Sequence, residues 1–450
     1  MPVLENLFRI SEAGSTIKKE ITAGTVTFMA LSYIIFVQPA ILSNPNGPGM
    51  DFGSVMVATC IASGIATLLM GFMANYPIAL APAMGHNFFF AFTVCGAAAY
   101  GGMGYPWQAA LGANFLAGAI FIIISRWGVR EKLLIAIPGS LKHSIAVGIG
   151  LLIAFIGFQW GGIVVATPGT MVGIGNLKAP HVLLTIGGTI LIAMLMALRI
   201  NGAIFWGILA SAVAGIPLGI VKYGGIVSLP PSISPTLFRL DIIGAFAQKG
   251  FLTVIFVLLL LAMFDTVGTL VGVAERAGLM KNGNLPRAQQ ALLADAIGTT
   301  SGTLLGTSTV TCYIESAAGV SEGGRTGFSN MITGLLMFLS LFFYPLVKMI
   351  GGGYEVSQGK IIYPVLAPAL IIVGVLMFQS VTKINWNDIT EAFPSFLTMT
   401  VMQYAFSITE GISFGFISYC ILKLASGKGK DVHWMIYLFS ALFLMKYTFL

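Results

Sequence analysis

The chain has 450 residues, of which 57% are hydrophobic and 9% are charged, and its mean hydropathy is +0.92. A hydrocarbon core about 30 Å thick requires roughly 20 apolar residues for each spanning helix. This composition predicts a polytopic membrane protein without a separate soluble domain. The net charge of +7 does not indicate nucleic-acid binding, because in a membrane protein the positions of Lys and Arg are more informative than their sum.

The sequence contains no pattern typical of an enzyme or a metal site. The four cysteines, Cys60, Cys95, Cys312 and Cys420, lie in apolar segments without metal-ligand spacing. No HExxH, P-loop or nucleophile-elbow motif is found. We therefore expect no metal and no cofactor, and a membrane-embedded enzyme is disfavoured.

Apolar runs separated by charged or Gly/Pro-rich breaks predict two sets of seven spans. The first set lies near 21–43, 54–75, 77–98, 106–126, 139–160, 181–199 and 203–221. The second set lies near 251–274, 288–306, 307–322, 328–350, 361–379, 392–408 and 411–424. A further apolar segment at 433–450 has no counterpart and is interpreted as an appended helix.

The basic residues orient these spans. Residues 1–20 lack the layout of a signal peptide and are expected to form a cytoplasmic surface helix. With this end inside, sixteen of the 23 Lys and Arg residues fall at inside ends and six at outside ends, with Lys446 unassigned, which agrees with the positive-inside rule. Because each set has an odd number of spans, the halves enter from opposite sides, as in an inverted repeat.

The third span of each half departs from a regular helix. Residues 77–87 contain two prolines and a glycine, which should interrupt a helix. Residues 307–322 begin with Thr and Ser and become helix-forming only near Ile314. Broken segments at matching positions of two halves indicate a transporter site, because half-helix N-termini and freed backbone groups meet at the midplane.

Polar residues within apolar runs mark the same region. An acid at membrane depth costs at least about 2.5 kcal/mol, so Asp265 and Glu315 are expected to face a cavity, a partner or a substrate. Asn87 and Glu315 are expected at the starts of the two half-helices. The alternatives are a local N-cap for Asn87 and a buried carboxylate bonded to Thr hydroxyls for Asp265. His86 fits either a proton relay or a backbone cap, and Asp295 is expected to pair with a neighbouring helix.

Three stretches resemble the nucleobase:cation symporters, most closely the branch of adenine, guanine and hypoxanthine permeases. They are APAMGHNFFFAFTV at 81–94, FDTVGTLVGVAERAGL at 264–279 and PRAQQALLADAIGTTSGTLLGTSTVTCYIESAAGVSEGGRTG at 286–327. The resemblance extends from about residue 5 to about residue 445. It implies an all-α membrane protein of the uracil-transporter-type fold, with 14 transmembrane segments in two inverted seven-span repeats. In that fold, short strands in spans 3 and 10 pair beside the substrate.

The resemblance also implies a core domain, holding the first four spans of each half, and a gate domain. The expected segments are a cytoplasmic N-terminal segment 1–20, core parts 21–126 and 241–350, gate parts 127–240 and 351–432, and the appended helix 433–450.

By resemblance, Asp265 and Glu315 are substrate-binding acids and Asn87 is a contributing polar residue. The full set of expected substrate-binding residues is Asp265, Glu315, Asn87, Thr309, Phe264 and Ser308. The expected proton-coupling residues are Asp265, Glu315 and His86. Phe264, Phe88 and Tyr313 are the alternatives for an aromatic side chain that stacks on the substrate.

Several positions near the expected site depart from the family pattern. Relatives usually have Gly at the position of Ala83, Leu at that of His86 and Thr at that of Cys312, and some carry a second acid at that of Ala262. Purine preference, affinity and coupling are therefore left open.

The resulting hypothesis is a secondary active transporter in the plasma membrane that imports adenine, guanine or hypoxanthine by alternating access. A purine base is flat and neutral, and carboxylates accept hydrogen bonds from its N–H groups. The coupling ion is expected to be a proton, with Na+ as the alternative, and whether the protein is a homodimer is open. The rival hypothesis is an anion transporter or channel on the same architecture. Two acids and no basic residue at membrane depth argue against it.

Overall fold

The computed structural model describes residues 2–98, 101–126, 137–280, 285–357 and 360–449, without the side chains of Pro2, Phe264, Val267, Lys446, Thr448 and Phe449. The helices up to the middle of the chain are α1 (Pro2–Phe8), α2 (Ile17–Leu31), α3 (Tyr33–Leu42), α4 (Phe52–Ala74), α5 (Met84–Phe88), α6 (Trp107–Arg126), α8 (Gly139–Trp160), α9 (Pro180–Ala197), α10 (Ala203–Gly215) and α11 (Ile242–Phe246). They are followed by α12 (Phe251–Arg276), α13 (Ala288–Leu305), α14 (Ser316–Ser321), α15 (Phe328–Leu339), α16 (Tyr344–Gly351), α17 (Ala367–Phe378), α18 (Ile389–Tyr404), α19 (Ile408–Ala425) and α20 (Trp434–Phe449).

These helices form two compact units. The first comprises Met1–Trp127 and Gln159–Ala369, and the second Gly128–Phe158 and Leu370–Leu450. This grouping reflects packing. The expected division into core and gate domains concerns movement during transport and stays a prediction.

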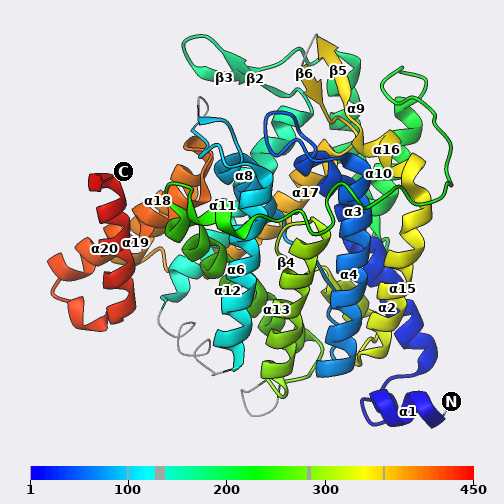
Figure 1. Cartoon of the computed structure of the whole chain (residues 1–450), viewed down its shortest axis with the longest axis horizontal. Coiled ribbons are helices and arrows are strands. Elements are labelled where there is room, and N and C mark those ends of the chain that lie inside the picture. Colours follow the sequence, from blue (N-terminus) through cyan, green and yellow to red (C-terminus); the bar gives the residue numbers. More distant parts are fainter. Residues whose placement is uncertain (1, 99–100, 127–136, 281–284, 358–359, 450) are drawn as a thin grey trace. The chain divides into compact units, whose positions relative to one another are not determined.

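The first unit is built around α4 and α13, which lie side by side (Figure 1). The other contacts come in related pairs. Helix α4 packs on α15 and α13 packs on α6; likewise α2 packs on α15 and α12 packs on α6. In a third pair of contacts, α14 packs on α2 and α5 packs on α12. Each contact therefore has a counterpart in which the roles of the two halves of the chain are exchanged.

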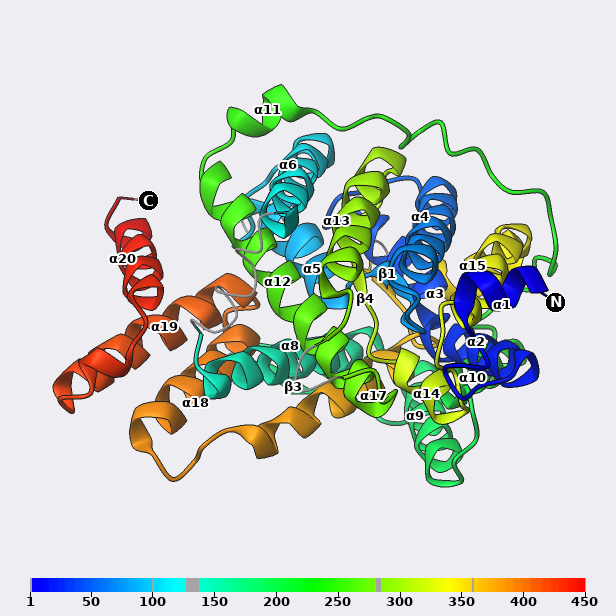
Figure 2. The ribbon, with the colours of Figure 1, turned by 90° about the horizontal axis from the view of Figure 1, so that it is seen from below.

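Two short strands join the halves at the centre of this unit (Figure 2). Strand β1 (Leu80–Pro82) pairs antiparallel with β4 (Val310–Cys312), with Ala81 opposite Thr311. The expected strands in the third and tenth segments are thus confirmed. Two hairpins, β2 (Val164–Thr167) with β3 (Met171–Ile174) and β5 (Tyr354–Ser357) with β6 (Lys360–Ile362), complete the strands of the described residues.

Glycines allow the closest helix contacts in the first unit. A Cβ at Gly24 of α2 would lie 2.3 Å from the carbonyl oxygen of Ser329 on α15, and one at Gly327 would lie 2.2 Å from that of Gly71 on α4. Both distances are shorter than van der Waals contact. Close approach of this kind is typical of helix packing in membranes, where small residues let backbones touch.

The second unit has a polar cluster where α8, α18 and α19 meet. Asp388 is the N-cap of α18 and accepts hydrogen bonds from Thr390 N (2.9 Å) and Thr390 Oγ1 (2.7 Å). Lys428 Nζ lies 3.2 Å from Asp388 Oδ2, and the buried Lys423 Nζ lies 3.4 Å from Glu391 Oε1. Ser140 of α8 donates to Glu391 Oε2 (2.5 Å).

Each predicted span overlaps at least one helix of the described residues, although the predicted break at 409–410 lies inside α19 (Ile408–Ala425). Among the described residues, eight helical stretches are long and apolar enough to cross a membrane, and three shorter apolar helices are found at 203–215, 367–383 and 434–445. A helical polytopic membrane protein is confirmed, whereas the count of 14 spans stays a prediction. Segment 433–450 contains helix α20, which contacts α19 through Ser440 and Cys420 (3.2 Å between Oγ and Sγ).

One prediction for the N-terminus is wrong. Residues 1–20 do not form a single surface helix, because α1 ends at Phe8 and α2 already begins at Ile17. Phe8 and Ile10 are buried against Phe328, and the carboxylate of Glu20 is fully buried. The physical reason is that the apolar residues of this segment find a partner on α15, which an amphipathic pattern alone does not reveal.

The Asp388 cluster predicts a pH-dependent contribution to stability. Hydrogen bonds from Thr390, together with Lys428 and Lys423, hold the pKa of Asp388 well below its usual range. Because this pKa is lower in the folded than in the unfolded protein, the ionised carboxylate stabilises the fold at pH values above the unfolded pKa of about 3.9. This stabilisation is lost as the pH falls towards the pKa of the folded protein. We expect Asp388→Ala to lower the Tm in detergent by about 2 °C or more at pH 7, because the cap is lost.

The difference in Tm between wild type and Asp388→Ala should shrink below about pH 4. Asp388→Asn is the matched control, because Asn retains the capping oxygen and loses only the charge. A Tm difference that does not change between pH 7 and pH 3 would contradict the assignment.

Candidate functional site

The paired strands place backbone groups and side chains of both halves within the membrane-spanning region. The ladder continues beyond the strands, because Ala83 N donates to Thr309 O and Tyr313 N donates to Ala79 O, each at 2.9 Å. Backbone N–H and C=O groups that face away from the partner strand form hydrogen bonds with side chains of neighbouring helices. Thr67 of α4 donates to Leu80 O (3.0 Å) and accepts from Leu80 N (3.0 Å).

The outward-facing backbone groups of β4 also form hydrogen bonds with side chains of a neighbouring helix. Thr299 of α13 donates to Val310 O (2.7 Å), and Asp295 Oδ1 accepts from Cys312 N (3.2 Å). The phenol of Tyr313 donates to Pro82 O (2.5 Å). An unpaired backbone group at this depth would be costly, so these side chains make a two-stranded sheet tolerable there.

Asp265 lies on α12, and 41% of its side chain is exposed. Its Oδ2 accepts from Thr311 Oγ1 (3.3 Å) and lies 3.9 Å from Nδ1 of the buried His86. The expected bond to a Thr hydroxyl is therefore present, and part of the Asp265 side chain is accessible. The imidazole of His86 is buried beside Asp265.

Glu315 is the N-cap residue of α14, so the prediction that it begins a half-helix is confirmed. Its Oε1 accepts from the phenol of Tyr33 on α3 (2.9 Å). The ring of Tyr33 lies 6.4 Å from that of Tyr313, with an interplanar angle of 46°. One carboxylate and two aromatic rings thus come together from α3 and the segment between β4 and α14.

Asn87 is fully buried, but the N-cap interpretation is wrong. The N-cap of α5 is Ala83, and Asn87 is the fourth residue of that helix. The extended strand β1 turns into a helix earlier than the glycine and histidine suggest. The side chain of Asn87 instead crosses to the other half, where its Oδ1 accepts from Ser308 Oγ, while its Nδ2 has no partner among the described residues.

Gln38 of α3 and Asn114 of α6 were not predicted. Gln38 Nε2 donates to Thr307 Oγ1 (2.9 Å) and to Ser308 Oγ (3.0 Å). The signal that could have found Gln38 is a single amide in the run YIIFVQPAIL, because a polar group at membrane depth requires a partner. Asn114, which lies between apolar residues in the middle of α6, gives the same signal.

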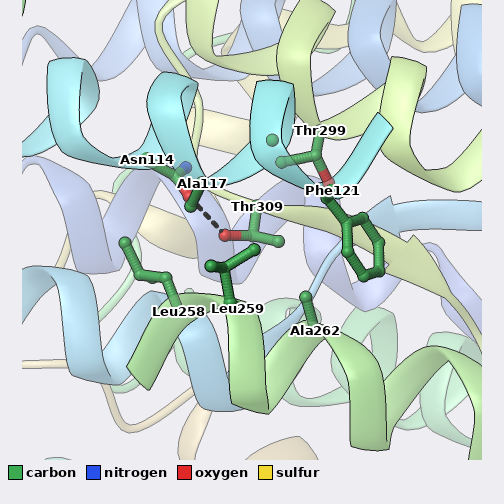
Figure 3. Close-up of a pocket in the computed structure, with 9 residues that line it drawn as sticks. Asn114, Ala117, Phe121, Leu258, Leu259, Ala262, Thr299 and Thr309 are labelled. Carbon is green, nitrogen blue, oxygen red and sulfur yellow. Dashed lines mark hydrogen bonds between the residues drawn. The ribbon is translucent and has the colours of Figure 1, made fainter. Parts of the chain in front are cut away.

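Thr309 faces a different direction from Ser308. Its hydroxyl donates to Asn114 Oδ1 (2.7 Å), and both residues line a small hollow between α6, α12 and α13 (Figure 3). Leu258 and Ala262 of α12 form the opposite wall. The side chain of Phe264 lies outside the described part of the structure, so its predicted contact with substrate stays a prediction.

The arrangement can hold a small neutral molecule. It offers two carboxylates as acceptors, a buried amide donor at Asn87, and the rings of Tyr33 and Tyr313. Within the described ranges, no group of three His, Cys, Asp or Glu residues is placed to hold a metal ion.

Comparison with known proteins identifies the class. The family model described as the permease family matches residues 18–414. The chain belongs to the permease family. The permease is 42% identical over 449 residues to the adenine permease AdeP of Escherichia coli (strain K12), covering 100% of this chain and 96% of AdeP. It is 43% identical over 443 residues to the guanine/hypoxanthine permease PbuO of Bacillus subtilis (strain 168), covering 98% of this chain and 99% of PbuO.

These findings confirm the resemblance to adenine and guanine/hypoxanthine permeases and make the protein a transporter, not an enzyme. Among solved structures, the transmembrane domain of a cyanobacterium bicarbonate transporter, BicA, matches with a TM-score of 0.60 and 16% identity, covering 89% of the permease and 97% of that domain. At this identity the likeness shows a shared fold only, which is the uracil-transporter-type fold.

The side chains that bond the outer edges of the strands should stabilise the permease. We expect Thr67→Val and Thr299→Val each to lower the free energy of unfolding by about 1–3 kcal/mol, because a buried backbone group loses its partner. Thr67→Val should have the larger effect, since the Thr67 hydroxyl both donates and accepts.

The four cysteines are buried, so a thiol-reactive dye reports unfolding in detergent. Thr189→Val is the matched control, because that hydroxyl bonds only Thr185 O of its own helix (2.8 Å). Equal thermal stability of all three variants would show that the strand edges do not depend on these hydroxyls.

Proposed function

We propose that this permease imports purine nucleobases, such as adenine, guanine or hypoxanthine, across the plasma membrane by proton symport. The observation that carries the proposal is the pairing of β1 with β4, which gathers Asp265, Glu315 and Asn87 in one compact unit. The relatives named adenine permease and guanine/hypoxanthine permease, identical at 42% and 43% of positions, support the same substrate class.

The chemistry of a purine edge matches this set of groups. Ring N–H and exocyclic amine groups donate, so they suit the carboxylates of Asp265 and Glu315, while ring nitrogens or a carbonyl oxygen accept from the amide of Asn87. Ser308 orients that amide through its hydrogen bond to Asn87 Oδ1. The proposed contacts of Phe264 and Thr309 complete the set.

Of the two described candidates for stacking, Tyr313 fits better than Phe88. Its ring lies next to that of Tyr33, whose phenol holds Glu315. Phe88 instead stacks on Phe92, with centroids 5.9 Å apart. A flat base stacked on Tyr313 would present its edge to Glu315.

Proton coupling is assigned to Asp265 and Glu315, with His86 as the neighbour of Asp265. Protonation of one carboxyl on the outer side and release on the inner side would link purine entry to the proton gradient. Na+ is the alternative coupling ion. An anion as the main substrate is disfavoured, because within the described residues neither carboxylate forms an ion pair with Lys or Arg.

Alternating access is proposed to arise from movement between a core (21–126 and 241–350) and a gate (127–240 and 351–432). The exchanged helix contacts, such as α4 with α15 against α13 with α6, support two inverted seven-span repeats. A cytoplasmic N-terminus follows from the distribution of basic residues, and the proposal includes 14 spans.

The direct test is uptake of radiolabelled adenine by cells that lack their own purine permeases. Guanine, hypoxanthine and xanthine should compete and uracil should not, and a protonophore should reduce uptake about tenfold or more, since a gradient worth 1.4 kcal/mol shifts an equilibrium tenfold. Uptake that requires Na+ and resists the protonophore would replace the proton by Na+. Absence of uptake of every purine by correctly inserted protein would overturn the substrate class.

The two acids should be indispensable for uptake. Asp265→Asn and Glu315→Gln each replace an acceptor by a donor facing the base, and an unpaired buried group costs about 2–3 kcal/mol, which corresponds to roughly 30-fold or more in kcat/KM. Glu322→Gln is the control, because Glu322 bonds Asn201 (2.9 Å) at an exposed position. Uptake at the wild-type rate in either acid variant removes that residue from the mechanism.

A further inference from the structure

Asp295 is a buried carboxylate that the proposed transport mechanism does not use. It lies on α13 and is fully buried. Its Oδ2 accepts from Thr266 Oγ1 of α12 (2.9 Å), and its Oδ1 accepts from Cys312 N of β4 (3.2 Å). The sequence predicted only that this acid would pair with a neighbouring helix, which is confirmed. The structure adds that it joins three elements.

Thr266 and Cys312, which both bond Asp295, are the immediate neighbours of two residues of the proposed site. Thr266 follows Asp265 on α12, and Cys312 follows Thr311 on β4. Thr311 in turn donates to Asp265 (3.3 Å). Helix α12 and strand β4 are therefore joined twice, once directly through Asp265 and Thr311 and once through Asp295 behind them.

The geometry points to Asp295 as a positioning residue for the substrate site. The effect of Asp295 on transport rests on the proposed function. Successive side chains of a strand point to opposite faces, so fixing the Cys312 backbone from behind fixes where Thr311 projects in front. The bond to Thr266 fixes the turn of α12 that carries Asp265. Asp295 thereby sets the distance between the Asp265 carboxylate and β4 without touching the substrate.

This role also explains one departure from the family pattern. Cys312 Sγ lies 3.7 Å from Asp295 Oδ1, and the side chain is buried in the core with Leu80 and Val310. Position 312 therefore faces Asp295 and not the Asp265 carboxylate. The residue type at 312 influences the site through the position of Asp295 and β4.

The test compares purine uptake kinetics of Asp295→Ala and Asp295→Asn, normalised to inserted protein. Asn keeps one oxygen for Cys312 N and can donate to the Thr266 hydroxyl, so it preserves both links, whereas Ala removes both. We expect Asp295→Ala to raise the KM about tenfold, the equivalent of one lost hydrogen bond to a charged group, with Vmax nearly unchanged, and Asp295→Asn to raise the KM less. Equal KM values in the two variants, or a fall confined to Vmax or to the amount of protein, would overturn the assignment.

Two further variants separate positioning from general stability. Glu20→Gln is a matched control, because Glu20 is also a fully buried carboxylate that accepts from backbone N–H groups, at Arg325 (2.9 Å) and Ser329 (3.3 Å). It should leave the KM unchanged. The double variant Asp295→Ala/Thr311→Val should raise the KM by less than the product of the single effects, because both changes act on Asp265. Independent effects would contradict the proposal.

A readout without substrate keeps this test separate from the proposed function. In hydrogen exchange, the peptide that contains β4 should exchange faster in Asp295→Ala than in wild type, and Glu20→Gln should not show this change. If the wild-type permease takes up no purine, the proposed function fails, and unchanged exchange of β4 would then overturn the role of Asp295 by itself.

Discussion

The requirement that every backbone polar group at membrane depth be bonded governs the centre of this protein. A two-stranded sheet has two outer edges, and open edges are not tolerated in the hydrocarbon region. Here the edge groups of β1 are bonded by Thr67, and those of β4 by Thr299 and Asp295. The one position of β1 without an N–H to bond is a proline, Pro82, which is where a strand edge accepts proline most easily.

Because the edge partners come from specific helices, backbone bonding also arranges the site. Thr67 lies on α4 and Thr299 on α13, and each hydroxyl donates to the first residue of a strand. Side chains that alternate along the extended segment 307–312 then reach different neighbours: Ser308 contacts Asn87, Thr309 contacts Asn114, and Thr311 contacts Asp265. The same strands that interrupt two spans therefore distribute polar groups to α5, α6 and α12.

Local sequence was sufficient for those features that a single segment determines. Prolines and a glycine in 77–87 predicted a broken helix, and the Thr- and Ser-rich start of 307–322 predicted a second break before the helix that begins after Glu315. Features that need two segments were not predictable in this way. No pattern near Tyr33 or Gln38 states that α3 will lie against the segment that follows α13. The alternative of an N-cap at Asn87 was wrong because the residue at which β1 turns into α5 depends on the pairing of β1 with β4.

The proposed site lies within one unit, and this location constrains the proposed transport mechanism. Asp265, Glu315 and Asn87 all belong to the first compact unit, and hydrogen bonds link each of them to a partner within that unit. A proposed site whose residues are each held by a partner in the same unit does not need to be rebuilt at each step. In the proposed cycle, access therefore changes by movement of other helices around a fixed site, as is common in transporters built from repeats. Residues that act through backbone position, such as Asp295, would then affect affinity on both sides of the membrane equally, because they hold a geometry that the cycle does not alter.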